Sequence, residues 1–290
     1  MNLTYGADPE FFASTKEHGV ISPALLVEEN KLDILEYDEK HPIFFKNDKF
    51  SWMMDGVAFE ITLFKPYENP ESIYHEIQNA LEVLKDILDG VTYEDCPITV
   101  ETLPTIKITP DIYLEKMENP MIFQGFIFGC DPDMDAIEMG YEGNTIDVYS
   151  HEWRYGAGHI HIGTGSKEFL NKIVDKEELD KMIQLMALYA GNTAIAFSSN
   201  PELDKQRTFH YGRPGRFRPQ TWGFEYRTPS NLWTKSLKTT KKIFEASAKA
   251  VGAYQNNLWA ELTEKYLYST IYNILEADKK GAREILAQLP

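Results

Sequence analysis

The chain has 290 residues, of which 43% are hydrophobic and 13% aromatic, and its formal net charge is −16. This composition excludes a disordered chain, and the negative charge argues against nucleic acid or an anionic membrane as the main partner because phosphate groups would repel it. No run approaches the roughly 20 apolar residues that span a bilayer, and no secretory signal pattern opens the sequence. We therefore expect a soluble, cytoplasmic protein that forms one α+β domain over residues 1–290.

Short β-type segments separated by turns fill the first 65 residues, and the predicted strands cover residues 3–5, 11–13, 43–46 and 57–64. A helix is predicted next. Asn69 provides its N-cap and Pro70 its first residue, and apolar residues recur at helical spacing until Gly90 ends the pattern.

Further strands are predicted at residues 97–103, 121–128, 158–163 and 223–228. A second helix begins after Asp175, where Glu178 completes a capping box, and its apolar stripe continues to Ala190. Helical patterns also cover residues 232–255 and the chain from residue 258 onward. Cys96 and Cys130 have no metal-motif spacing to each other, so the sequence favours buried, reduced thiols.

Carboxylates stand on predicted strands that are otherwise apolar. Asp8 and Glu10 are two residues apart, so in an extended segment their side chains share a face. Glu60 lies within the apolar 57–64 strand, where an unpaired carboxylate carries a heavy desolvation cost that a cation would remove.

Two later strands repeat this placement. His159 and His161 share a face of a strand bounded by glycines, and Glu225 and Arg227 share a face of theirs. Each cluster alone also fits a structural role: an Asx turn, a salt bridge between Glu60 and Arg227, or histidines hydrogen-bonded in a core. Their conjunction favours one site that combines oxygen ligands, imidazoles and a fixed positive charge.

Five segments carry these residues: Gly6-Ala7-Asp8-Pro9-Glu10-Phe11-Phe12, Asp55-Gly56-Val57-Ala58-Phe59-Glu60, Gly129-Cys130-Asp131-Pro132-Asp133, Gly158-His159-Ile160-His161-Ile162-Gly163 and Phe224-Glu225-Tyr226-Arg227-Thr228. As a set, in order from residue 6 to about residue 233, they resemble the phage-type carboxylate-amine ligases of the glutamine synthetase and glutamate-cysteine ligase-like superfamily. The resemblance implies a curved, mostly antiparallel sheet with helices on its convex face and with ATP and divalent metals on its concave face.

The resemblance also implies roles for individual residues. Its metal ligands correspond to Glu10, Glu60, His159 and Glu225, although which of the two strand histidines touches metal stays open. Glu225 and Arg227 are the expected catalytic residues, and Arg227 matches an arginine that steadies phosphate. Residues 207–219 combine arginines with glycines and prolines and are predicted to form an exposed loop. From charge, loop context and position, the ATP or phosphate contacts are assigned to Asp8, His161, Arg213, Arg216, Arg218 and Arg227.

The implied reaction transfers the γ-phosphoryl group of ATP to a carboxylate, and an amine then displaces phosphate to form an amide. Mg²⁺ or Mn²⁺ and an arginine would neutralise the charge, and the 207–219 loop would keep water from the acyl phosphate. The acid and the amine, whether small molecules, peptides or proteins, stay open, as does the oligomeric state. A metal-dependent hydrolase and a non-catalytic metal-binding protein are the alternatives, and dependence on ATP separates the three.

Overall fold

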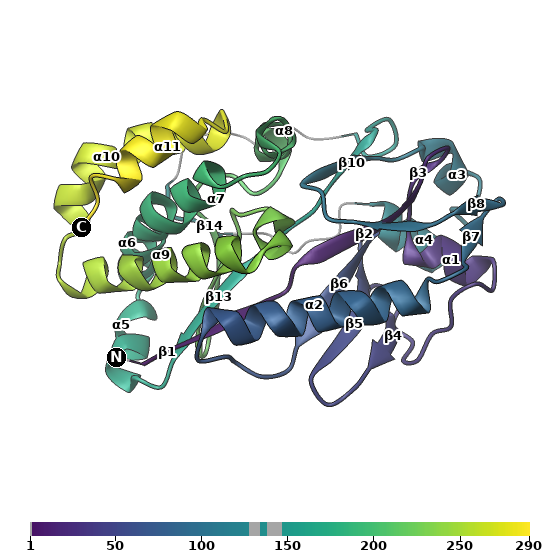
Figure 1. The fold of residues 1–290 in the computed structure, drawn as a ribbon, viewed down its shortest axis with the longest axis horizontal. Helices are drawn as coiled ribbons and strands as arrows, with labels where there is room; N and C mark the ends of the chain where they lie inside the picture. The colour runs from purple at the N-terminus through teal and green to yellow at the C-terminus, as the bar shows by residue number, and fades with distance from the viewer. Residues whose placement is uncertain (1, 128–133, 138–146) are drawn as a thin grey trace.

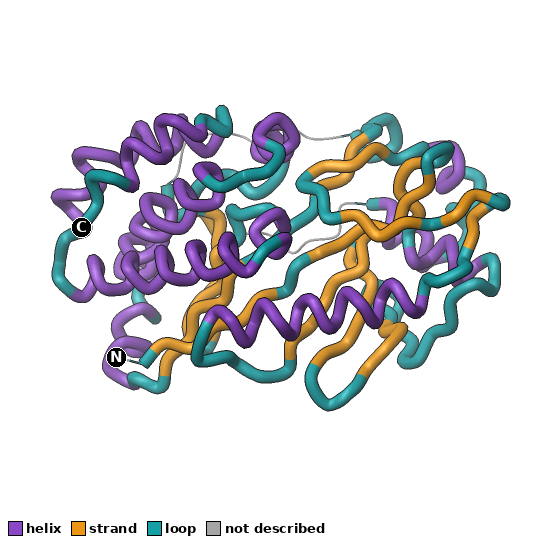
Figure 2. The backbone as a smooth tube through the Cα atoms, in the orientation of Figure 1, coloured by secondary structure: helices purple, strands orange, loops and turns teal. Residues whose placement is uncertain are grey.

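A computed structural model describes residues 2–127, 134–137 and 147–290 of the chain. The fold is α+β, and its antiparallel sheet curls into a half-barrel. Most helices gather at one end of the molecule, where both termini also lie, and the strands run through the middle to the other end (Figure 2). The helix α2 (Pro70–Ile87) crosses the middle, and the far end holds α1 (Pro23–Glu28), α3 (Pro110–Leu114) and α4 (Pro120–Phe126). The α+β class predicted from the sequence is therefore confirmed.

Two antiparallel sheets make up the half-barrel, with strand orders β1-β13-β15-β14-β11 and β3-β2-β6-β5-β4, and β9 also pairs with β2. Two short pairs, β10-β12 and β7-β8, lie outside them. The strands are β1 (Leu3–Ala7), β2 (Glu10–Thr15), β3 (Gly19–Ile21), β4 (Ile43–Lys46), β5 (Phe50–Asp55), β6 (Ala58–Leu63), β7 (Thr92–Tyr93), β8 (Cys96–Pro97), β9 (Thr99–Glu101), β10 (Thr105–Lys107), β11 (Met134–Asp135), β12 (Trp153–Tyr155), β13 (Ile160–Thr164), β14 (Arg216–Gln220) and β15 (Gly223–Tyr226).

The two sheets are joined by the chain itself, because β1 and β2 follow each other along one diagonal of the molecule (Figure 1). β1 pairs with β13, whereas β2 pairs with β6. Between them stand Asp8 and Pro9, and Pro9 has no N–H to donate to a ladder. The change of partner therefore falls at the first acidic motif.

The helices are α1 (Pro23–Glu28), α2 (Pro70–Ile87), α3 (Pro110–Leu114), α4 (Pro120–Phe126), α5 (Lys167–Ile173), α6 (Lys176–Met186), α7 (Asn192–Ala196), α8 (Pro201–His210), α9 (Leu237–Gln255), α10 (Trp259–Leu275) and α11 (Lys279–Leu286), with a π-helical turn at Ala187–Gly191 and a 3₁₀ turn at Asn231–Lys235. Side-chain caps start several of them as the sequence predicts. Asn69 accepts the Ser72 N–H at 2.9 Å, and Asp175 accepts the Glu178 N–H at 3.2 Å.

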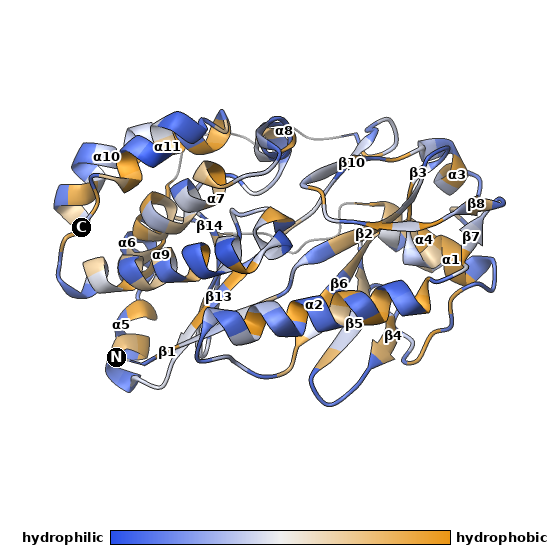
Figure 3. Cartoon of the chain, in the orientation of Figure 1, coloured by the Kyte–Doolittle hydropathy of each residue, from blue (hydrophilic) through white to orange (hydrophobic). Residues whose placement is uncertain are grey.

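Each sheet buries one set of alternating residues under helices. Trp52 of β5 donates its indole N–H to the Ala80 carbonyl of α2, which fixes that helix on the β5–β6 face. On β15 it is Tyr226 that turns toward the helices, where its hydroxyl lies close to Gly191 of the π-helical turn. Hydrophobic and hydrophilic residues alternate along α2 and α9 (Figure 3), as expected for helices with one buried face. Glu60 and Glu225 stand on the opposite, helix-free faces of their strands.

Two predicted elements are wrong, and a third is a shorter strand than predicted. The 121–128 segment is not a strand: α4 occupies Pro120–Phe126, because Asn119 caps a helix that Pro120 opens, and residue 128 lies outside the described ranges. The 207–219 segment is not one loop, since α8 includes Arg207 and β14 begins at Arg216. The segment at residues 97–103 holds only the end of β8 and the short β9.

The prediction of buried, reduced thiols can be compared with the structure at Cys96 alone. Cys96 is a free thiol and is half-buried rather than buried. Cys130 and the motif that contains it, Gly129 to Asp133, lie outside the described residues. None of the helices in the described residues is both long enough and apolar enough to cross a bilayer.

We expect Gly158→Ala to destabilise the protein by about 1–3 kcal/mol, the usual cost of overpacking. A Cβ atom at Gly158 would lie 2.4 Å from the Ser230 carbonyl oxygen and 2.6 Å from the Trp233 indole nitrogen. Gly165→Ala is the control, because no heavy atom lies within 4 Å of its added Cβ. Chemical denaturation of both variants tests this, and equal stabilities would contradict the close packing between β13 and the segment after β15.

Candidate metal and phosphate site

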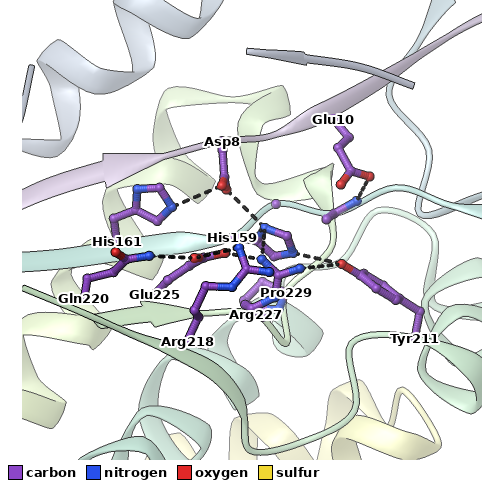
Figure 4. Close-up of polar contacts among 12 residues, drawn as sticks. Asp8, Glu10, His159, His161, Tyr211, Arg218, Gln220, Glu225, Arg227 and Pro229 are labelled. Carbon is purple, nitrogen blue, oxygen red and sulfur yellow. Dashed lines mark hydrogen bonds and ion pairs between the residues drawn. The ribbon is translucent and has the colours of Figure 1, made fainter. Parts of the chain in front are cut away.

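One row of residues in register crosses four strands on the helix-free face of the first sheet. Gly6 of β1 lies opposite His161 of β13, His161 opposite Glu225 of β15, and Glu225 opposite Arg218 of β14. A Cβ at Gly6 would be 3.3 Å from the His161 ring, so the glycine makes room for the imidazole. Strand pairing thus aligns residues that are more than 200 positions apart in the sequence, from Gly6 to Glu225, and brings His161 beside Asp8 (Figure 4).

Asp8, His161 and Glu225 form the first group of potential metal ligands, with donor atoms within 4.8 Å of one another. His161 Nε2 lies 3.3 Å from Asp8 Oδ2. Burial raises the pKa of Asp8, but the facing imidazoles of His161 and His159 outweigh it and hold that pKa well below its usual range. Burial lowers the pKa of His161, but Asp8 outweighs burial and raises it overall.

His159 and Arg227 lie behind this first group and connect its two carboxylates. His159 Nδ1 is 3.1 Å from Asp8 Oδ1 and 3.3 Å from Glu225 Oε1, and its Nε2 is 3.2 Å from the Tyr211 hydroxyl. Arg227 forms an ion pair with Glu225 and donates to the Tyr211 hydroxyl at 3.1 Å. Both side chains are almost fully buried. His161 thus shares the group of potential ligands with Asp8 and Glu225, whereas His159, the histidine predicted to bind metal, lies against both carboxylates from behind; which of the two would bind a metal stays open.

Glu10, Asp55 and Glu60 form the second group, again with donor atoms within 4.8 Å of one another. Glu10 and Glu60 face each other across β2 and β6, and Asp55 ends β5. One carboxylate oxygen of Glu10 accepts the Ala157 N–H at 2.9 Å. Within the described ranges, none of the three carboxylates forms an ion pair with a Lys, Arg or His side chain. The alternative of a structural Glu60–Arg227 salt bridge is therefore not found, and Arg227 pairs with Glu225 instead.

Like charge and burial act together on the second group. Burial, followed by repulsion from Asp55, raises the pKa of Glu10 to about 8, against the opposing effect of the Ala157 N–H. Burial and repulsion from Asp8 and Asp55 raise the pKa of Glu60 well above its usual value. The charge of Glu225, in the first group, also raises the pKa of Glu60. The two groups therefore interact electrostatically. A divalent cation would relieve both causes, and oxygen-rich ligand sets with at most one imidazole suit Mg²⁺ or Mn²⁺.

The structure divides the predicted phosphate contacts. Arg218 Nη1 lies 3.7 Å from Glu225 Oε2, at the edge of the first group. Arg216 is 3.6 Å from Asp135 Oδ2, outside the two ligand groups, and the backbone carbonyl of Arg213 accepts the Thr228 hydroxyl.

Sequence reasoning missed three residues of this region: Asp55, Tyr211 and Arg207. Asp55 precedes Gly56 in one of the segments used for the family resemblance, but a strand over Phe50–Asp55 was not predicted. Tyr211 follows directly after α8, which was not predicted either. The signals for α8 were present, since Asn200 caps the helix and Pro201 opens it.

Arg207, expected in an exposed loop, is 1% exposed. Its guanidinium donates to the carbonyls of Thr228 and Pro229 at 2.7 and 3.2 Å and lies over the Tyr211 ring. A Cβ at Gly212 would be 2.2 Å from this guanidinium, so the glycine is required there. Arg207 thus holds both the end of β15 and the tyrosine that contacts His159 and Arg227.

Comparison of the chain with models of protein families, with curated proteins and with solved structures found no match.

Without metal, we expect stability to fall as pH rises from about 5 to 8. In this window the unfolded chain has released the Glu10 proton, whose ordinary pKa is 4.5, while the folded protein holds it up to about pH 8. Thermal melts in chelator measure this slope. Adding Mg²⁺ or Mn²⁺ at pH 8 should raise the melting temperature, and an absence of both effects would contradict the cation site.

Glu60→Gln should melt at or above the wild-type temperature at pH 8 without metal, because it removes one buried like charge. It should also show a flatter pH slope and a smaller gain from Mg²⁺. Glu264→Gln, an exposed carboxylate of α10, is the matched control and should behave as wild type. A marked loss of metal-free stability in Glu60→Gln alone would assign Glu60 a structural role instead.

Proposed function

We propose that this protein is an ATP- and Mg²⁺-dependent ligase that joins a carboxylate to an amine on a glutamine synthetase-like sheet. The observation that carries the proposal is the pair of adjacent ligand groups, one with three unpaired carboxylates and one beside a buried arginine. Phosphoryl transfer needs little covalent help from the protein but much neutralisation of charge on the phosphate oxygens. Cations held by the two groups would supply that neutralisation, together with Arg227 and Arg218.

The residues of the first group have complementary tasks in this proposal. Arg227 presents a planar guanidinium whose position is set by Glu225, His159 and Tyr211, so little reorganisation is needed when a phosphoryl group comes close. Arg218 approaches from the neighbouring strand with a half-exposed side chain, which leaves it able to reach solvent-borne phosphate.

A cleft of about 530 Å³ beside His161 is the place we assign to the organic part of a substrate. Sites for small molecules commonly measure about 300–1,000 Å³. Phe64, Lys65 and Trp222 line it, and the Trp222 ring lies 5.4 Å from the His161 ring. An aromatic wall next to carboxylate ligands suits a molecule with one flat or apolar part and one anionic part.

ATP dependence is the first test. Purified protein with Mg²⁺ and ATP should release phosphate faster when the correct acid and amine are added from a panel of amino acids and peptides, and the amide product should appear in equal amount. Activity that needs metal without ATP would instead show a hydrolase. Metal binding without any turnover across the panel would leave a non-catalytic metal-binding protein, and both results would overturn the proposal.

Arg227→Lys separates the catalytic from the structural role of this arginine. Lysine keeps the charge but loses the planar fork, so we expect turnover to fall by about 10² to 10³ while the melting temperature changes little. Arg227→Ala should in addition cost about 3–5 kcal/mol, because it leaves Glu225 buried without its partner. Arg283→Lys in α11 is the control. Undiminished turnover in Arg227→Lys would remove Arg227 from the mechanism.

A further inference from the structure

A second kind of metal-ligand cluster lies away from this site, where two tight turns meet. The turn between β2 and β3 carries Glu17 and His18, and the turn between β7 and β8 ends at Cys96. The carboxylate, imidazole and thiol donor atoms of these three residues lie within 4.8 Å of one another. Glu94, in the same second turn, places Oε2 3.4 Å from His18 Nε2. Three potential donors therefore converge from segments about 80 residues apart, and Glu94 lies beside the imidazole of this group as a fourth.

The backbone holds these donors in place independently of any ion. The His18 N–H donates to the Thr15 hydroxyl, and its carbonyl accepts the Thr109 hydroxyl. The Tyr93 ring packs edge-on against the imidazole with centroids 5.4 Å apart. Glu94 has a positive φ of 47°, which is uncommon for a residue with a side chain, and the tight turn sets Tyr93 opposite Cys96.

The chemistry of the donors selects the ion. A thiolate with an imidazole and carboxylates is a borderline-soft set, which favours Zn²⁺ over Mg²⁺. The donor atoms around a tetrahedral zinc ion lie about 3.5 Å from one another. Side-chain rotations that move the donor atoms by about 1 Å would therefore close the observed cluster around one ion. Desolvation and the hydrogen bond that the thiol donates to the Glu17 carboxylate raise the pKa of Cys96, which argues against a reactive redox cysteine.

We propose that Glu17, His18, Glu94 and Cys96 form a structural zinc site that ties the β2–β3 turn to the β7–β8 turn. Binding releases the thiol proton to solvent and leaves a thiolate–zinc bond, with no change in oxidation state. The ion would stabilise the strand that begins with Glu10 at its far end, although this site takes no part in the proposed ligase reaction.

Co²⁺ tests the site because a thiolate–Co²⁺ bond absorbs in the near ultraviolet, whereas Co²⁺ on carboxylates does not. Chelator-treated full-length protein, with excess Mg²⁺ present to occupy the carboxylate groups, is titrated with Co²⁺. We expect a band that saturates at one equivalent and is displaced by Zn²⁺. Cys96→Ser should abolish it and Cys130→Ser should retain it. A band that is absent, or that survives Cys96→Ser, would overturn the proposal.

Two further measurements support the test, and the first uses only the wild-type protein, so it does not depend on how a variant folds. In the wild-type protein, one equivalent of Zn²⁺ should slow alkylation of Cys96 at least tenfold, as read from the modified peptide, and equal rates would refute the site. His18→Ala should weaken Co²⁺ binding by more than about tenfold, since losing even an outer-shell partner commonly costs that much. Unchanged affinity in His18→Ala would likewise exclude the proposed ligand set.

Discussion

Negative charge gathered on the helix-free face of the sheet is the constraint on which the rest of this structure depends. Glu10, Asp55 and Glu60 stand together where burial already disfavours the charged carboxylate. The fold holds them there all the same, because β2, β5 and β6 are fixed by their ladders and by the aromatic residues packed under α2. Backbone pairing and core packing therefore supply the free energy that keeps like charges close.

The two ligand groups meet this constraint differently. In the first group, Asp8 and Glu225 are balanced within the protein by His161, His159 and Arg227. Among the described residues, the second group is opposed by less positive charge: the Ala157 N–H contacts Glu10, and the more distant Arg207 guanidinium lowers the pKa of the same carboxyl. On charge alone, the second group gains more from a divalent cation than the first. The first group is instead preorganised, because hydrogen bonds and ion pairs orient Asp8, Glu225 and Arg227 before any ligand arrives.

Sequence alternation predicted which residues lie on this face but not how they divide into groups. Period-two patterning placed Glu60, His161 and Glu225 opposite the apolar residues of their strands, and the structure agrees. Strand order and register depend on contacts between distant segments, so the pairing of His161 with Gly6 and Glu225 had no local signal. The placement of His161 among the potential ligands, with His159 behind them, follows from that register.

The wrong predictions have local causes. The spacing of apolar residues at 121–128 fits a strand and a buried helix equally well. The structure has a helix there, because Asn119 caps it and Pro120 is its first residue. Arg207 was expected to be exposed because arginine usually is, yet carbonyls freed at the end of β15 need a donor in the interior. A charged residue is a poor guide to exposure where backbone carbonyls can hydrogen-bond it.

Arg227 shows why the two readings of this site, structural and catalytic, are not exclusive. Its guanidinium offers five donors, and its ion pair with Glu225 and its contacts with His159 and Tyr211 fix the plane of the fork. A buried ion pair adds little net stability compared with an apolar core, so stability alone is a weak reason for one at this place. A fork held rigid beside two groups of potential metal ligands has a second use on the proposed function, because an incoming anion can share an already desolvated and oriented positive charge. On the proposed function, the cost of burying Arg227 is thus offset during catalysis and not during folding.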